Sequence, residues 1–190
     1  MKYFKLVYLV TALIASASAY GADLSYNFIQ LDIGNSETDV EGVEIDGDSF
    51  GVWGSFEISD DLYVVGGYSS SDFDFDLEQT ALGVGLGVHK STGVSTSVHG
   101  EVLLVRAEVE LGGFGSEDDN GYGFNVGVRH LIGEKIELDA SFSYLDIFDD
   151  TETGISIGGR GYMTETTSLG LFYSSADDTD GFNMSLRFDI

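Results

Sequence analysis

Apolar and polar residues alternate along most of the chain from Leu24 to Ile190. The clearest stretch is TALGVGLGVH at 80–89, where leucine and valine take every second position and glycine most of the positions between. Successive side chains of a strand point to opposite faces, so this period of two predicts β-strands. The pattern predicts ten strands, with eight as an alternative, over residues 24–34, 48–58, 61–72, 77–89, 94–111, 121–132, 135–147, 153–163, 167–175 and 181–190.

In two of these strands the apolar residues switch between odd-numbered and even-numbered positions partway along the strand. The first changes near Phe28–Ile29 and the fifth near Leu103–Val105, and each change indicates a β-bulge. A bulge near Leu104 would turn Arg106 toward the face that carries the other arginines.

The connections between the predicted strands alternate between two kinds. One set is short, as at 59–61 and 133–135, and the other is longer and acidic, as at 35–48 and 112–121. Short turns at one end and longer loops at the other are typical of an outer-membrane barrel with an even number of strands and both termini on the turn side. The prediction is an all-β, transmembrane, antiparallel up-and-down β-barrel.

The first residues differ from this pattern. Lys2 and Lys5 precede a short apolar run, and small residues follow around Ala17 and Ala19. This arrangement is typical of a secretory signal peptide, and the run is too short for a transmembrane helix. We predict a signal peptide over 1–19, with cleavage after Ala17 or Ala22 as alternatives, and one barrel domain over 20–190.

Composition agrees with an exported barrel. The chain has no Cys and no Pro, and it contains 26 Gly, 13 Phe and 10 Tyr. Its formal net charge of −25 makes nucleic acid an unsuitable partner, because phosphates would be repelled. The 43% of apolar residues, placed in regular alternation, argues against disorder.

The chain resembles a known family in its signal peptide, its alternating strands, the stretch GSFEISDDLYVVGGYSS at 54–70 and the closing NMSLRFDI at 183–190. It is similar to the small porin-like outer-membrane β-barrels of Gram-negative bacteria. That resemblance implies an outer-membrane location with both termini periplasmic, contact with membrane lipid and lipopolysaccharide, and insertion by the barrel assembly machinery. Members typically end in an aromatic residue, whereas this chain ends in Ile190 with Phe188 two positions earlier.

The glycines at 83, 85 and 87 do not form a phosphate-binding loop. They alternate with apolar residues, and no helix pattern follows them. On the inner face of a narrow barrel, these glycines, together with Gly123 and Gly127, would make room for long side chains opposite.

Charged residues are expected to fill that room. Parity places three of the four arginines of the exported chain on inner faces, with several acids on the same faces. Bidentate pairing between arginine and carboxylate suits such a confined place. Arg129 is expected beside Glu137 and Asp139, and Arg160 level with about Ala140. The predicted lumen ion network comprises Arg129, Arg160, Arg187, Glu137, Asp139, Glu57 and Glu101.

The acidic segments are candidates for weak binding of divalent cations, since clustered carboxylates suit hard cations. None fits an EF-hand, and we predict no metal site and no cofactor. The candidate residues are Asp46, Asp48, Asp118, Asp119, Asp177 and Asp178.

Catalysis has little support in the sequence. His99 and Ser97 share an inner face but lie two residues apart on one strand, without a third partner. We therefore predict no catalytic residue and no enzyme.

The exterior is expected to carry aromatic girdles at the two membrane interfaces. The candidates are Tyr26, Phe28, Tyr122, Phe142, Tyr144 and Phe182. The predicted function is a structural or surface-interaction role for a barrel with a charged, largely plugged lumen. A narrow channel for small solutes or ions is the alternative, and a lipid-modifying enzyme or protease ranks last.

Overall fold

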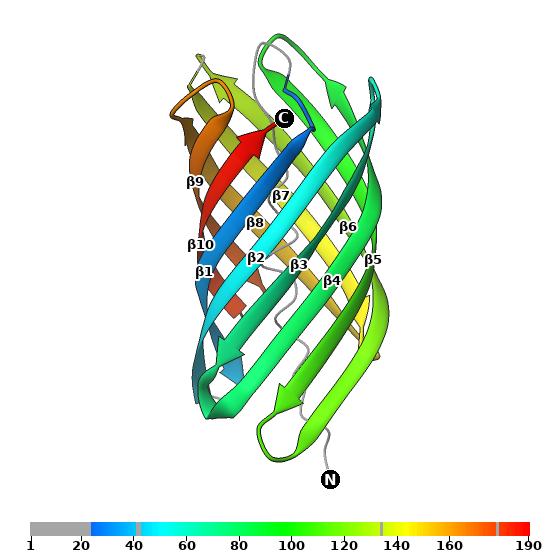
Figure 1. Ribbon diagram of the computed structural model, residues 1–190, viewed down its shortest axis with the longest axis vertical. Coiled ribbons are helices and arrows are strands. Elements are labelled where there is room, and N and C mark those ends of the chain that lie inside the picture. Colours follow the sequence, from blue (N-terminus) through cyan, green and yellow to red (C-terminus); the bar gives the residue numbers. More distant parts are fainter. Residues whose placement is uncertain (1–23, 41–42, 134, 178) are drawn as a thin grey trace.

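The computed structural model describes residues 24–40, 43–133, 135–177 and 179–190, which form a closed antiparallel barrel (Figure 1). Each strand pairs with the next along the chain, and β1 pairs with β10 to close the cylinder. The described residues make ten strands, which confirms the count of ten over eight. The strands are β1 (Phe28–Val40), β2 (Val43–Ser59), β3 (Leu62–Phe73), β4 (Leu77–Ser91), β5 (Thr96–Leu111), β6 (Gly115–Ile132), β7 (Ile136–Ile147), β8 (Asp150–Tyr162), β9 (Thr167–Ala176) and β10 (Thr179–Asp189).

The strands run further than the sequence pattern suggested, and the long acidic loops are largely absent from the described residues. The β1–β2 ladder continues to the Val40–Val43 pair, and only Gly112–Phe114 separate β5 from β6. Period-two alternation simply continues through the acidic stretches. In these stretches polar and charged side chains occupy both faces of the strand. The alternation of apolar with polar residues is lost there, so the sequence pattern does not reveal the strand. We call the end of the barrel that carries these acidic stretches the acidic end. The opposite end, which holds the C-terminus, is the turn end (Figure 1).

Both predicted bulges are wrong. β1 keeps one register with β10 and with β2 throughout, and β5 keeps one register with β4 and β6. The register of β2 with β3 shifts instead between Glu57 and Ser59, next to the turn end. The apparent changes of parity arise because apolar and aromatic side chains occupy the interior as well as the exterior.

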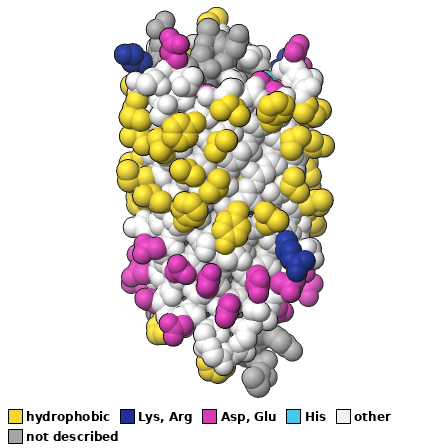
Figure 2. Space-filling model, in the orientation of Figure 1, with side chains coloured by type: hydrophobic (Ala, Val, Ile, Leu, Met, Phe, Trp, Pro, Cys, Tyr) yellow, Lys and Arg dark blue, Asp and Glu magenta, His cyan; other side chains and the backbone are white. Residues whose placement is uncertain are grey.

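The outside of the barrel carries a continuous apolar band (Figure 2). On β4, for example, Leu82, Val84, Leu86 and Val88 face outward and each is more than half exposed. Four or five such residues per strand, on tilted strands, give the band of about 25 Å that spans an outer membrane. Among the described residues, no helix is long and apolar enough to cross a bilayer.

Carboxylates lie on the outward face just beyond this band, at the acidic end (Figure 2). The strands therefore project past the apolar region as a hydrogen-bonded cylinder. The expected girdle residues divide into two groups. Tyr122, Phe142, Tyr144 and Phe182 face outward, whereas Tyr26 and Phe28 are buried inside the barrel. The girdle expectation is thus wrong for these last two residues.

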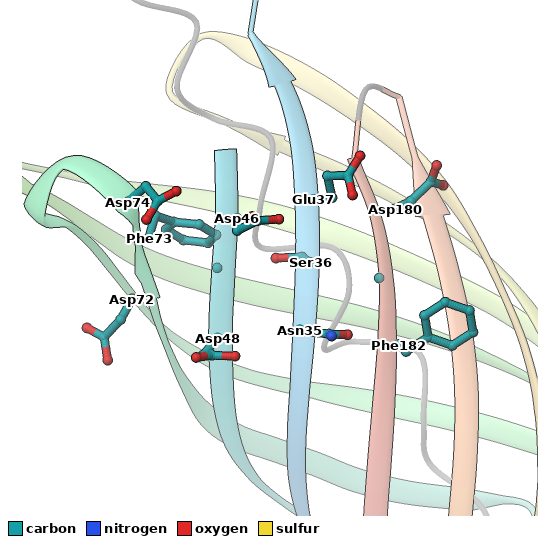
Figure 3. A pocket seen from close by; sticks show the side chains of 12 residues that line it. Asn35, Ser36, Glu37, Asp46, Asp48, Asp72, Phe73, Asp74, Asp180 and Phe182 are labelled. Atoms are coloured by element: carbon teal, nitrogen blue, oxygen red, sulfur yellow. The ribbon is translucent and has the colours of Figure 1, made fainter. Parts of the chain in front are cut away.

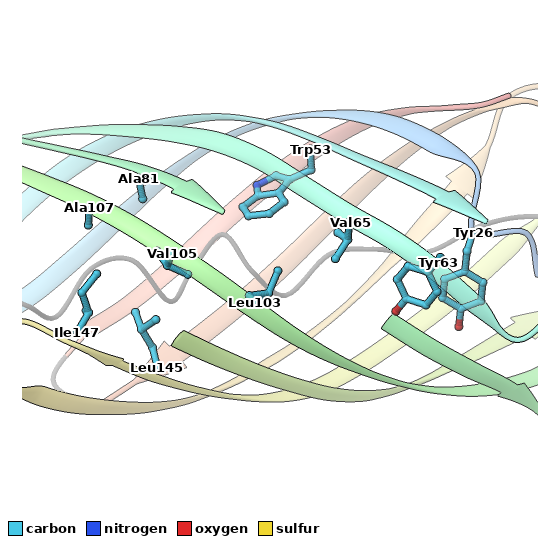
Figure 4. Close-up of a cluster of buried hydrophobic side chains, with 10 residues drawn as sticks. All are labelled: Tyr26, Trp53, Tyr63, Val65, Ala81, Leu103, Val105, Ala107, Leu145 and Ile147. Atoms are coloured by element: carbon cyan, nitrogen blue, oxygen red, sulfur yellow. The ribbon is translucent and has the colours of Figure 1, made fainter. Parts of the chain in front are cut away.

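The interior contains an apolar cluster that runs from Tyr26 and Tyr63 near the turn end to Ala107 and Ile147 toward the acidic end (Figure 4). Trp53 crosses over Gly67 and Gly83, and the Tyr63 ring occupies the space beside Gly87. The inner glycines therefore admit bulky side chains from neighbouring strands. The cluster consists of Tyr26, Trp53, Tyr63, Val65, Ala81, Leu103, Val105, Ala107, Leu145 and Ile147.

Two sequence predictions lie outside the described residues. The signal peptide over 1–19 is one, and Asp178 as a cation ligand is the other.

Candidate functional site: a charged and aromatic network inside the barrel

Glu137 lies at the centre of a buried cluster near the turn end of the lumen. Its Oε1 is 3.2 Å from Nε of Arg129 and 3.7 Å from Nε of Arg160. The hydroxyl of Tyr162 donates a hydrogen bond of 2.6 Å to Oε2 of Glu137. The side chains of both arginines and of Glu137 have no exposed surface. Two guanidinium groups and one phenol thus share one carboxylate away from solvent.

Strand register brings these groups together. Across the β6–β7 hairpin Arg129 stands opposite Asp139, and across β7–β8 Arg160 stands opposite Glu137. The expected alignment of Arg160 with Ala140 is wrong, since Ala140 pairs with Ile157. The prediction assumed a longer loop near Asp150.

The observed β7–β8 connection is a two-residue turn formed by Phe148 and Asp149. Both residues have positive φ, 56° and 58°, as in a type I′ hairpin turn. This tight turn sets the register that places Arg160 beside Glu137.

Arg187 reaches the same end of the lumen from β10. Its Nε donates a hydrogen bond of 2.9 Å to Oδ1 of Asp189, and its guanidinium carbon lies 3.9 Å from the centre of the Phe28 ring. Arg129 lies over Tyr26 at 4.7 Å in the same way. Cations over aromatic faces gain electrostatic attraction, most strongly where water is excluded. The inner aromatic residues therefore help to hold the arginines.

A second group of polar residues continues the network around the inner wall. Glu101 accepts hydrogen bonds from the hydroxyl of Tyr63 at 2.7 Å and from the amide of Asn125 at 3.1 Å. Glu57 is partly exposed at the turn end, and its Oε1 lies 3.3 Å from Nε2 of His89. These two acids contact neutral donors or histidine. Among the described residues, neither forms an ion pair with one of the three inner arginines.

The rings of the inner wall stack on one another. The ring of Tyr26 lies 3.9 Å from that of His89 and 4.7 Å from that of Tyr63, centre to centre. His99 meets Tyr26 edge-on at 6.3 Å and its ring fills the space beside Gly127. His99 thus packs as one of these stacked aromatic groups.

Arg106 lies outside the barrel and not in the network. Without a bulge in β5, it faces outward, and its Nη2 is 2.8 Å from Oδ2 of Asp118. Both side chains are more than half exposed. The conditional expectation of a fourth inner arginine is therefore wrong.

The cation candidates that the structure describes lie at the acidic end. Asp119 accepts a hydrogen bond from the backbone N–H of Phe148, and Asp177 accepts one from that of Thr153. Beyond the apolar band, a hydrogen bond from Tyr173 to Asp180 lowers the pKa of the Asp180 carboxyl.

Asp46 and Asp48 line a cavity of about 640 Å³ (Figure 3). The labelled carboxylates around it come from several strands and point in different directions (Figure 3). Within the described ranges, no group of three or more His, Asp or Glu side chains is placed to hold a metal ion.

Sequence reasoning missed several members of the network. Tyr26, just before β1, faces inward, and so do Phe28, Gln30 and Asp32 on β1 and Tyr162 on β8. The signal was present in β1, where Ile29, Leu31 and Ile33 occupy the opposite parity. A single unbroken alternation would have placed all four residues inside.

The fold and the exterior band define an outer-membrane β-barrel. The family described as outer membrane protein beta-barrel domain matches residues 6–174, and the chain belongs to this family. No curated protein sequence matches the chain significantly.

Solved structures share the fold at low sequence identity. A KdgM porin in complex with disordered oligogalacturonate has a TM-score of 0.52 and 6% identity, covering 86% of this chain and 99% of the other. The translocator domain of the autotransporter NalP from Neisseria meningitidis has a TM-score of 0.50 and 9% identity, covering 87% and 89%. A bacterial polysaccharide outer membrane secretin gives 0.52 and 10%, covering 88% and 67%. These likenesses establish the barrel fold alone.

Proposed function

We propose that this protein is a closed outer-membrane barrel whose lumen is plugged by its own side chains. Its role is structural, or it interacts with surface partners through the acidic end. The observation that carries this proposal is the buried contact of Arg129, Arg160 and Tyr162 with the single carboxylate of Glu137.

Packing supports a plug across the turn end. Arg129, Glu137, Arg187 and Tyr26 each have no exposed surface. Tyr26, two residues before β1, lies 3.1 Å from Ser97 on β5, measured between the hydroxyl oxygens. Since β1 and β5 are not neighbours in the barrel, this contact crosses the lumen.

Burial of charge also supports a fixed plug. A buried ion pair is retained only where its geometry and its remaining hydrogen bonds offset the loss of hydration. The Glu137 carboxylate has such partners in both oxygens. Solute flow would require these pairs to separate, and breaking one leaves an uncompensated buried charge.

A narrow channel for small solutes or ions is the second candidate. Charged side chains that line a lumen are the elements that set selectivity in pores. KdgM, which shares this fold, is a porin. In this second case the arginines are the selectivity elements and the network opens to admit solute.

A catalytic role is not part of the proposal. The inner histidines are stacked against Tyr26 and lie away from the acidic end. The acidic end is proposed to face outward and to attract divalent cations only weakly, with both termini in the periplasm. Lipid and lipopolysaccharide surround the apolar band, and the barrel assembly machinery inserts the chain.

Conductance in a planar bilayer separates the two candidates. The refolded protein, with folding checked by the mobility of an unboiled sample on a gel, is expected to give no discrete current steps. A Tyr26→Ala, Arg129→Ala double variant removes side chains from the plug and is expected to conduct. Arg106→Ala removes an arginine from the outer face and is the matched control, which should remain silent.

Discrete steps from the folded wild-type protein would overturn the plug. Steps that change in ion preference with Arg129→Ala, but not with Arg106→Ala, would establish the channel. A folded but silent double variant would also contradict the assignment of these side chains as the plug.

A further inference from the structure

The inner wall formed by β8, β9, β10 and β1 carries buried hydrogen-bond donors that have no acceptor among the described residues. Nη2 of Arg160 and both Nη atoms of Arg187 are such donors, and the hydroxyls of Ser168 and Ser185 also lack a partner there. Each of these four residues is at most 2% exposed. They stand together on neighbouring strands, and these Nη and hydroxyl groups are separate from Nε of Arg160, which faces Glu137.

Strand register places the four residues around Gly170. Across β8–β9 Arg160 stands opposite Gly170, and across β9–β10 Ser185 stands opposite the same glycine. In the next row of inner residues, Ser168 stands opposite Arg187. A Cβ at Gly170 would collide with the Ser185 hydroxyl and lie 3.4 Å from Cβ of Arg160. The missing side chain therefore lets the serine and the arginine approach each other.

Contacts with other inward-facing residues hold the two guanidinium groups in place. Nη1 of Arg160 donates a hydrogen bond of 3.2 Å to Oε1 of Gln30, and its guanidinium carbon lies 5.2 Å from the centre of the Phe172 ring. Arg187 is held through Nε by Asp189 and by the ring of Phe28. Each arginine thus uses one edge for protein contacts and leaves other N–H groups directed at the interior.

The chemistry of these free donors is that of an oxyanion site. Guanidinium groups present a planar fork of N–H donors that matches carboxylate, phosphate and sulfate oxygens. Serine hydroxyls add further donors. A buried donor without an acceptor is unfavourable, and the unfavourable effect is greater for a charged group.

We propose that Arg160, Arg187, Ser168 and Ser185 bind one small free oxyanion inside the barrel. Arg160 lies two residues from the end of β8 and Arg187 three residues from Ile190, so the site lies near the turn end. Glu137 and Asp189 pair with the same two arginines, and Asp32 also interacts with both. Their negative charge makes the binding weak and favours a compact anion. This proposal is independent of the proposed plug, because an anion can bind at this site whether or not the barrel conducts.

Thermal unfolding of the refolded full chain in detergent tests the site. Sodium sulfate is titrated against sodium chloride at equal ionic strength, and unfolding is followed by the fluorescence of Trp53, the single tryptophan. A ligand that binds only the folded state raises the unfolding temperature until the site is saturated. The wild type and the outward-facing control Arg106→Gln should show this saturable rise, and Arg187→Gln should lose it.

Sulfate also stabilises proteins generally by exclusion from their surface. An equal, non-saturating rise in all three proteins, or no rise in the wild type, would overturn the proposal. Should Arg187→Gln fail to fold, the double variant Ser168→Ala, Ser185→Ala replaces it, with the same loss expected.

Crystals of the wild-type protein soaked in sodium selenate test the site without any substitution. The anomalous signal of selenium should appear between Arg160 and Arg187, within hydrogen-bond distance of both. Water density alone at this place, or selenium only at the surface, would show that solvent satisfies these donors and would refute the site.

Discussion

Arg129 and Glu137 face each other inside the barrel, with 3.2 Å between Nε and Oε1 and no exposed surface on either side chain. The pair spans the β6–β7 hairpin and joins the β8 residues Arg160 and Tyr162 through the same carboxylate. Three strands are thus connected by one acidic group, in addition to their backbone ladders.

Glu137→Ala is expected to lower the free energy of unfolding by about 3–5 kcal/mol, because it leaves buried guanidinium groups without their carboxylate. Urea unfolding in detergent, followed by Trp53 fluorescence, measures the change. The control is Asp61→Ala, which removes the exposed partner of Lys90 at 3.2 Å and should cost at most about 1 kcal/mol. Equal effects of the two substitutions would contradict the central role of Glu137.

Gly87→Ala should destabilise the barrel by about 1–3 kcal/mol through overpacking. The new Cβ would collide with the Tyr63 ring, whose hydroxyl donates to Glu101 at 2.7 Å. Gly93→Ala is the matched control, since a Cβ there meets nothing within 4 Å. The same unfolding measurement compares the two variants. If Gly87→Ala is as stable as Gly93→Ala, Tyr63 does not pack against this strand.

Leu86→Lys tests the assignment of the lipid-facing surface. Leu86 lies near the middle of the apolar band with 53% exposure, and a lysine there should cost about 2–4 kcal/mol in a bilayer. Val94→Lys places the same residue in the exposed β4–β5 turn outside the band and should be nearly neutral. Folding into phospholipid vesicles, scored by gel mobility across a urea series, gives both values. A neutral Leu86→Lys variant would place that face away from lipid.

Asp149→Gly should stabilise the barrel by about 0.5–1 kcal/mol. Asp149 is exposed and has φ of 58°, a conformation that glycine adopts without steric cost. Asp150→Gly, at a strand position with ordinary φ, should instead destabilise, because glycine weakens strands. Thermal unfolding of the two variants compares them directly. A loss of stability in Asp149→Gly would mean that its side chain contributes more than its backbone conformation costs.

The barrel class and the number of strands could be predicted from the sequence because alternation is a local property. The inward position of Arg129, Arg160 and Arg187 followed from the same property. The partner of Arg160 could not be predicted, because hairpin register depends on the length of the turn. A turn of two residues at Phe148 and Asp149, without glycine or asparagine, gives little signal in the sequence.

The errors in β1 and β5 have a common physical origin. Both predicted bulges assumed that apolar residues face lipid and polar residues face the lumen. The lumen also holds apolar and aromatic side chains, so Leu103, Val105 and Phe28 satisfy the alternation from the inside. In a narrow barrel, hydrophobicity alone does not distinguish the two faces; the parity of neighbouring residues such as Ile29 and Leu31 is the better guide.

The continuation of the strands past the apolar band affects the susceptibility of the folded protein to proteolysis. A protease needs several residues of chain that are free of hydrogen-bonded ladders and can enter its cleft. In the described part of the acidic end, Gly112–Phe114 and the pair Phe148–Asp149 are short connections between paired strands. The folded barrel should therefore remain intact under digestion that cleaves the unfolded chain, even in the region that stands clear of the membrane.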